Sequence, residues 1–351
     1  MSIITVKGLI NKDDLGITDT HDHVFVKMLP NTYIEKEPSE AAKSNLWNQK
    51  ISLENLGFLT LDSTCIKDNL ILDDTNTAIE ELIEFKKAGG NSIIDPTTVD
   101  LGRDPIALKK ISNLLDINII TCTGYYKKEY NQKKISNYSI SDIYEEMLKE
   151  ITLGIGKTGI RAGIIGELGT GEDISSTEKN VLIAAAKVNN EIGIPIMVHT
   201  EPWLPEWINV ARQILNILKE NGANLEKVCL CHLSHGFFKY DYFKEIINSG
   251  ALLGFDDFGE PYGGPEFSPS DTQRIDNLVK LLEDGFTSNI LLGNDVCHKI
   301  RLHKYGGWGY DHFLSNIIPK ILEKGISNDI IDSLIKINPK NYLDIPSFNL
   351  K

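Results

Sequence analysis

Short apolar runs alternate along the chain with longer stretches in which apolar residues recur at helical spacing. The runs are bounded by Gly, Pro or polar residues and are rich in Ile and Val. Most are almost continuously apolar, which is typical of strands buried on both faces in a parallel sheet. The predicted strands cover residues 16–23, 92–96, 117–124, 162–167, 194–199, 228–234, 251–255 and 289–295.

The stretches between these strands have the periodicity of amphipathic helices. In residues 75–88, for example, Ile79, Leu82 and Phe85 share one face, and Gly89 and Gly90 provide a stop signal. The alternation predicts a (β/α)8 barrel and not an open doubly wound sheet, and we find no GxGxxG or Walker-type phosphate loop. The predicted helices cover residues 75–88, 141–151, 176–191, 205–221, 242–249, 273–284 and 312–324.

We expect residues 1–351 to form a single barrel domain, because (β/α)8 barrels of this length are common. Residues 1–15 are expected to be a lead-in segment. Residues 24–74, after the first strand, are the least regular part of the sequence and are too long for an ordinary connection. This region is therefore predicted to contain short helices and to help roof the site.

Composition and charge argue against nucleic acids and anionic membranes as binding partners. The 351 residues carry a formal net charge of −13, so there is no basic field for nucleic acid or an anionic membrane. No apolar stretch is long enough for a membrane span, and no apolar signal core follows Met1. The five cysteines have no CxxC spacing, which favours reduced thiols. We expect a cytoplasmic protein that acts on a small molecule.

Potential metal ligands stand where the predicted strands end. His21 and His23 are two residues apart at the end of the first strand, so both rings project from one face. Such a pair alone is weak evidence. However, the fourth, fifth, sixth and eighth strands also end in ligand-type residues, which are Glu167, His199, His232 and Asp295.

Because barrel active sites lie at the C-terminal ends of the strands, these six side chains are predicted to meet. Taken singly, His199 and His232 could be ordinary strand-end histidines, Glu167 could accept a backbone amide, and Asp295 could cap a helix. Their joint occurrence favours a metal site. Six nitrogen and oxygen ligands suit two divalent cations, with Zn²⁺ the first candidate and Mn²⁺ or Co²⁺ as alternatives.

At this point the sequence resembles the phosphotriesterase-like family of the amidohydrolase superfamily. The resemblance runs from about residue 16 to about residue 343 and rests on separate segments: residues 20–23, 94–97, 123–126, 162–167, 198–200, 294–295, 305–310 and 338–339. It implies a (β/α)8 barrel with a binuclear metal centre, and a homodimer. It places His21, His23 and Asp295 on the buried metal, and His199 and His232 on the more exposed one.

The sequence departs from the family pattern at the bridging ligand. Many members bridge the metals with a carboxylated lysine after the fourth strand, where this chain has Glu167. Some relatives carry glutamate at this place, so Glu167 is the expected bridge. Because Glu is shorter, the backbone must approach the metals more closely, which Gly166 and Gly169 would permit.

The expected reaction is hydrolysis. Two cations lower the pKa of a shared water from about 15.7 towards about 7, and the resulting hydroxide attacks the substrate. Asp295 is expected to be the catalytic residue that takes the proton and relays it to the leaving group. Retention of Asp295 argues against a metal-binding scaffold without turnover.

Substrate recognition is expected in the loops after the strands. The candidate substrate-binding residues are Tyr125, Tyr126, Trp203, Tyr262 and Trp308, although wall packing is an equal reading of the two adjacent tyrosines. The roles of His235, His298 and His303 are left open between supporting, surface and substrate positions.

The family contains lactonases and enzymes with activity on organophosphate triesters. In this chain the loops after strands five and seven contain Glu201 and Glu260 where sugar-phosphate lactonases keep basic residues, which disfavours a phosphorylated substrate. The favoured hypothesis is a lactonase for a small neutral or hydroxylated lactone. A phosphoester, sugar-phosphate lactone or amide hydrolase on the same centre is the alternative.

Overall fold

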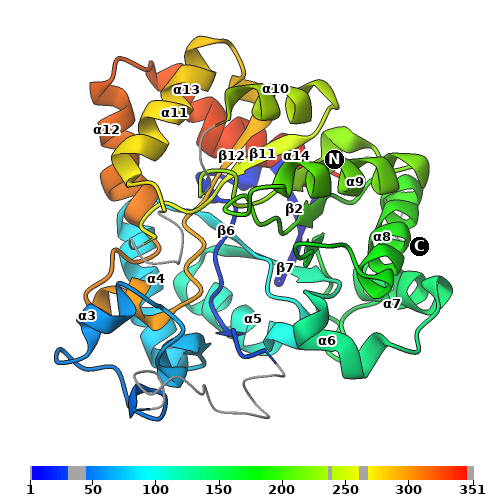
Figure 1. Ribbon diagram of the computed structural model, residues 1–351, viewed down its shortest axis with the longest axis horizontal. Helices are drawn as coiled ribbons and strands as arrows, with labels where there is room; N and C mark the ends of the chain where they lie inside the picture. Colours follow the sequence, from blue (N-terminus) through cyan, green and yellow to red (C-terminus); the bar gives the residue numbers. More distant parts are fainter. Residues whose placement is uncertain (1, 31–44, 236–238, 261–267, 346–351) are drawn as a thin grey trace.

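The computed structural model describes residues 2–30, 45–235, 239–260 and 268–345. Its main sheet has eight parallel strands that follow one another in chain order. The N–H of Thr20 donates to Leu292 O (3.0 Å), which joins the first strand of this sheet to the last and closes a barrel (Figure 1). The predicted (β/α)8 fold is confirmed. The strands are β3 (Thr18–Asp19), β6 (Ser92–Asp95), β7 (Asn118–Thr123), β8 (Ile164–Leu168), β9 (Ile196–Val198), β10 (Val228–Leu230), β11 (Leu252–Phe255) and β12 (Ile290–Leu292).

Helices surround the barrel, and their ends follow local capping signals (Figure 1). Ser175, for example, accepts from the Glu178 N–H while the Glu178 carboxylate accepts from the Ser175 N–H, a reciprocal cap that starts α8. The α-helices are α3 (Leu56–Leu59), α4 (Thr75–Lys87), α5 (Pro105–Leu115), α6 (Lys128–Ile135), α7 (Ile140–Thr152), α8 (Ser176–Ile192), α9 (Trp207–Glu220), α10 (Tyr240–Asn248), α11 (Asp271–Glu283), α12 (Ile318–Glu323), α13 (Asn328–Asp332) and α14 (Asn338–Leu343).

Short 3₁₀ turns and two π-helical turns complete the chain. The π turns directly precede α12 and α14, whose first turns contain Pro319 and Pro339, residues without an N–H to donate. The 3₁₀ turns are Lys12–Asp14, Lys67–Leu70, Val99–Leu101, Leu225–Lys227, Thr287–Asn289, Lys299–Arg301 and His303–Tyr305, and the π turns are Phe313–Ile317 and Ser333–Ile337.

The sequence prediction omitted α5, α6, α13 and α14. In α5, Ile106 and Leu114 are exposed while Leu108 and Ile111 are buried, so apolar residues occupy both faces and blur the helical period. The start of α5 nevertheless carries a recognisable signal. Asp104 caps the helix by accepting the Ala107 N–H, and Pro105 stands in the first turn.

The lead-in segment forms a hairpin across the lower end of the barrel. Strand β1 (Ser2–Thr5) pairs antiparallel with β2 (Gly8–Asn11), and the Val6 N–H donates to Ile119 O (2.9 Å). Ile3 belongs to the apolar core inside the barrel. This core seals the end opposite the predicted site; its members include Ile94, Ile120, Ile164, Met197, Cys229 and Leu291.

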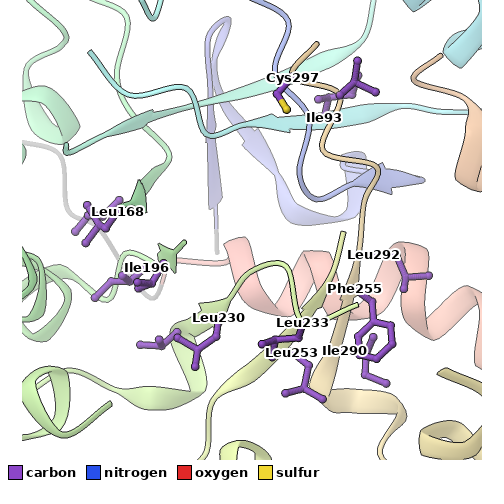
Figure 2. Close-up of a cluster of buried hydrophobic side chains, with 14 of the residues drawn as sticks. Ile93, Leu168, Ile196, Leu230, Leu233, Leu253, Phe255, Ile290, Leu292 and Cys297 are labelled. Carbon is purple, nitrogen blue, oxygen red and sulfur yellow. The ribbon is translucent and has the colours of Figure 1, made fainter. Parts of the chain in front are cut away.

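Alternate residues of the same strands pack outwards against the helices. Figure 2 shows several of these buried side chains, among them Ile93, Ile196, Leu230, Leu253 and Leu292. Burying each such side chain is worth about 1.5–3 kcal/mol relative to exposure. The strands are thus fixed by apolar layers on both faces, and their C-terminal ends are held rigidly in place.

The described residues after β3, 20–30 and 45–74, have little regular structure. Strand β4 (Val26–Lys27) pairs antiparallel with β5 (Ile71–Leu72), and residues 61–64 line a cavity at the C-terminal end of the barrel. The five cysteines are free and buried. Among the described residues, no helix combines the length and apolar character required to cross a membrane.

Candidate metal centre

All six predicted ligands come together at the C-terminal end of the barrel. Their ligand atoms form two groups, each with all its atoms within 4.8 Å of one another. The enclosed triad consists of His21, His23 and Asp295, and the open triad consists of Glu167, His199 and His232. The two triads touch through Glu167, whose Oε2 lies 2.7 Å from His232 Nε2 and whose Oε1 lies 3.9 Å from His21 Nε2.

A local irregularity in β8 brings Glu167 between the triads. The pairing of β8 with β9 shifts register between Ile165 and Leu168, where Glu167 stands. Gly166 has φ of 103°, and a Cβ there would come within 2.0 Å of Met197 O, so the close approach requires glycine. Two predicted ligands, His232 and Asp295, adopt left-handed φ angles of 66° and 53°, a backbone state that is uncommon for non-glycine residues.

The His21 ring supports a cation at this position. Its Nδ1 lies 2.7 Å from Asp256 Oδ2, so a neutral ring that donates from Nδ1 would present the lone pair of Nε2 to a cation. That Nε2 is buried and has no hydrogen-bond partner among the described residues. An unsatisfied buried nitrogen facing two carboxylates fits a metal ligand, because a bound cation would satisfy it.

The other three imidazoles are also oriented by neighbours. His23 Nδ1 lies 2.8 Å from Thr97 Oγ1, and its Nε2 lies 3.3 Å from Asp295 Oδ1. His232 Nδ1 lies 3.2 Å from Asp257 Oδ1. In such pairs, the outer partner fixes the tautomer and the ring orientation.

The open triad is oriented in part by a tyrosine and an ion pair. His199 Nδ1 lies 3.0 Å from Glu167 Oε2 and 3.1 Å from the Tyr126 hydroxyl. His199 Nε2 lies 3.9 Å from Glu201 Oε1, and Glu201 is paired with Lys127. The exposed fraction of the His199 side chain is 8%, against 0% for His21.

The electrostatics of the metal-free site also suit cations. Although burial opposes the charged ring, the carboxylates of Asp256, Glu167 and Asp295 raise the pKa of His21 to about 10. Although burial opposes its charge, the neighbouring histidines hold the pKa of Glu167 well below its usual value. The pKa of Asp295 is likewise lowered against the effect of burial, chiefly by its contact with His23. The lowered pKa values keep both carboxylates ionised, the form in which they can bind a cation.

A cavity of about 730 Å³ opens above the triads. Tyr126 and Trp203, two predicted substrate-binding residues, line it. The same wall contains two of the histidines whose roles the sequence left open, His235 and His298. His303 lies elsewhere and contacts Asp311 (2.6 Å).

Two other predicted substrate-binding residues, Tyr125 and Trp308, are not among the residues that line this cavity. Tyr125 is buried in the apolar core, where burial and a hydrogen bond with Glu146 raise its pKa. Trp308 is 55% exposed and stacks on His312 (5.0 Å), away from the residues that line the cavity. Tyr262 lies outside the described residues.

The sequence analysis missed the carboxylates that support the ligands. Asp256 accepts from the His21 ring through Oδ2 and from the His232 N–H through Oδ1 (2.7 Å). Asp257 contacts His232, and Thr97 contacts His23. A signal was available, because Asp256 and Asp257 directly follow the seventh strand, at the same end as the ligands.

The sequence and the fold are similar to those of known proteins. Residues 1–343 match the model of the phosphotriesterase family. An N-acetyltaurine hydrolase of Dictyostelium discoideum is 35% identical over 367 residues, covering 98% of each chain. The crystal structure of a resiniferatoxin-binding protein from Rhodobacter sphaeroides superposes with a TM-score of 0.92 and 31% identity, covering 98% of this chain and 95% of that one. A lactonase from Listeria monocytogenes shares the fold (TM-score 0.80, 23% identity, 99% and 100% coverage).

Proposed function

The chain belongs to the phosphotriesterase family of hydrolases, and from this premise we propose that it uses two divalent cations to cleave the amide bond of a small N-acyl substrate. The observation that carries the choice of an amide is the 35% identity to an N-acetyltaurine hydrolase over 98% of both chains. The lactonase from Listeria monocytogenes is 23% identical, so its likeness concerns the fold. The donor set of imidazoles and carboxylates supports Zn²⁺ first, with Mn²⁺ and Co²⁺ as alternatives.

The residues have distinct parts in this proposal. His21, His23 and Asp295 would hold one cation, His199 and His232 the other, and Glu167 would bridge them. When bound, the cations supply an activated water at neutral pH and polarise the carbonyl oxygen of the substrate. Breaking an amide also requires a proton on the departing nitrogen, because an amide anion is a very poor leaving group.

Asp295 is the group placed to move that proton. Its side chain is 16% exposed, against 3% for Glu167, and it lines the cavity while contacting His23. It can therefore accept a proton from the attacking water and pass it to the leaving nitrogen. Opening a small lactone, the activity that the sequence favoured, would use the same residues and stays a second candidate.

The test is a substrate panel on one preparation of protein, metal-depleted and then reloaded with Zn²⁺ or Mn²⁺. The panel contains N-acetyltaurine, N-acetylated amino acids, small lactones, sugar-phosphate lactones and a phosphotriester. We expect kcat/KM to be highest for an N-acyl substrate and activity to vanish on demetallation. Preference for lactones would replace the amide proposal, and turnover that survives demetallation would overturn the metal mechanism.

A further inference from the structure

We propose that His235, reached across the face of Trp203, is the subsite that holds an anionic end group of the substrate. This inference rests on the proposed function, since it assumes an N-acyl substrate whose carbonyl lies at the cations. The inference concerns the chemical class of the substrate group that lies farthest from the amide bond, which the residues around the cations do not determine. The class is a sulfonate or carboxylate separated from the amide nitrogen by a short aliphatic spacer.

Trp203 is a close neighbour of both the open triad and His235. The centroid of its ring system is 6.0 Å from His199, 6.4 Å from His232 and 4.8 Å from His235. All four rings line the cavity. A substrate whose carbonyl lies at the open triad would therefore extend along the Trp203 ring, and its far end would reach His235. The apolar ring face suits methylene groups.

His235 has hydrogen-bonding capacity to spare. Its Nδ1 is buried and has no partner among the described residues. A buried nitrogen left without a partner is costly, so the site is suited to a ligand that supplies one. Neutral or charged, an imidazole can donate an N–H to an oxygen acceptor, and sulfonate and carboxylate oxygens are strong acceptors.

The lysine and two glutamates on the cavity wall already have partners. Lys127 is paired with Glu201, and Glu260 accepts from the buried Arg301. Because Lys127 is already neutralised by Glu201, it is less suited to bind an anion than His235, whose Nδ1 has no partner among the described residues.

The carboxylate of Asp257, which also lines the cavity, has partners as well. Its Oδ1 lies 3.2 Å from His232 Nδ1, and its Oδ2 accepts from Ser234 Oγ (2.8 Å). Both oxygens of Asp257 are therefore occupied by contacts with His232 and Ser234.

The test compares one substrate with and without the anion in wild type and His235→Ala. N-acetyltaurine is the anionic substrate, and N-ethylacetamide has the same acetyl amide and no sulfonate. We expect the substitution to raise KM for N-acetyltaurine roughly 10–100-fold, as for loss of a hydrogen bond to a charged group. The kcat value should change less than about threefold, and kcat/KM for N-ethylacetamide should stay the same.

Further variants separate recognition from folding. His235→Gln keeps an N–H donor on a side chain of different shape and should give an intermediate KM. Circular dichroism and metal content verify the fold of each variant. His303→Gln removes a partly exposed imidazole outside the cavity and should leave both substrates unaffected.

The outcomes distinguish this inference from the function on which it rests. An unchanged KM for N-acetyltaurine in a folded His235→Ala protein would overturn the subsite while the amide hydrolase stands. Equal losses on both substrates would also overturn it, because the role would then be structural. If the wild type hydrolyses lactones and no N-acyl substrate, the proposed function fails. Inhibition of lactone hydrolysis by ethanesulfonate, weakened in His235→Ala, would then still support the subsite, and equal inhibition of both proteins would reject it.

Discussion

The two histidines of the enclosed triad and His199 of the open triad differ in what surrounds them. His21 and His23 have side chains that are 0% and 2% exposed, and their outer ring nitrogens contact Asp256 and Thr97. His199 faces the cavity wall and contacts Tyr126. This difference suggests a division of work, in which the enclosed half retains its cation and the open half adjusts to substrate. Variants of matched size can test it.

The largest effect is expected for Asp295→Asn, at the boundary between the enclosed triad and the cavity. Asparagine keeps one coordinating oxygen but cannot accept the proton, so kcat should fall roughly 10²–10⁴-fold. Steady-state kinetics together with elemental analysis would show the loss at nearly unchanged metal content. Normal turnover would remove Asp295 from proton transfer.

Asp256→Asn should weaken metal binding by about 10–100-fold, because the His21 ring loses a charged partner. Asp257→Asn, which touches His232 on the open side, is the matched comparison and should weaken it less. Asp256 also accepts the His232 N–H, whereas Asp257 does not. Chelator competition would measure both affinities. Equal losses would contradict the division between the two halves.

Thr97→Val should have a smaller effect, confined to metal retention. The substitution removes the oxygen that lies 2.8 Å from His23 Nδ1 at nearly constant volume. Loss of one neutral hydrogen bond corresponds to roughly 2–10-fold weaker binding. With saturating metal, kcat should return to the wild-type value. A kcat that stays low would instead give Thr97 a part in the reaction.

Tyr126→Phe is the counterpart on the open side and should have the smallest effect on metal binding. The hydroxyl lies 3.1 Å from His199 Nδ1 on the cavity wall, so its loss should change KM or kcat by roughly 2–10-fold. Metal content after dialysis should match the wild type. If Tyr126→Phe lost more metal than Thr97→Val, the contact on the open side would matter more for metal retention, contrary to this expectation.

Much of this arrangement could be predicted from the sequence because each candidate ligand terminates an apolar strand. His199 and His232 stand directly after buried runs, and the barrel rule then places them at one end. Glu167 needed one further inference, that adjacent glycines allow a close backbone approach, and the φ of Gly166 agrees with it. The local pattern is informative here because strand and ligand are contiguous.

The features that the sequence did not predict depend on the direction in which a side chain points, or on contacts between residues from different strands of the barrel. Tyr125 and Tyr126 are neighbours, yet one enters the core and the other the cavity, which the backbone path after β7 decides. Asp256 acquires its importance from His21, a residue distant in the chain. Trp308 belongs to a glycine-rich loop, and its position depends on stacking with His312.

The hairpin under the barrel is also where the two ends of the described chain meet. Ser2 and Ile345 form an antiparallel bridge, with the Ile345 N–H donating to Ser2 O (3.3 Å). A short linker between these positions would make the polypeptide circular, so new termini could be opened in a surface loop. Such circular permutants would change the order of the predicted metal-binding residues along the chain, and their positions in the folded barrel would stay the same. Attachment of the protein to a surface through this hairpin would leave the cavity at the opposite end of the barrel open to solvent.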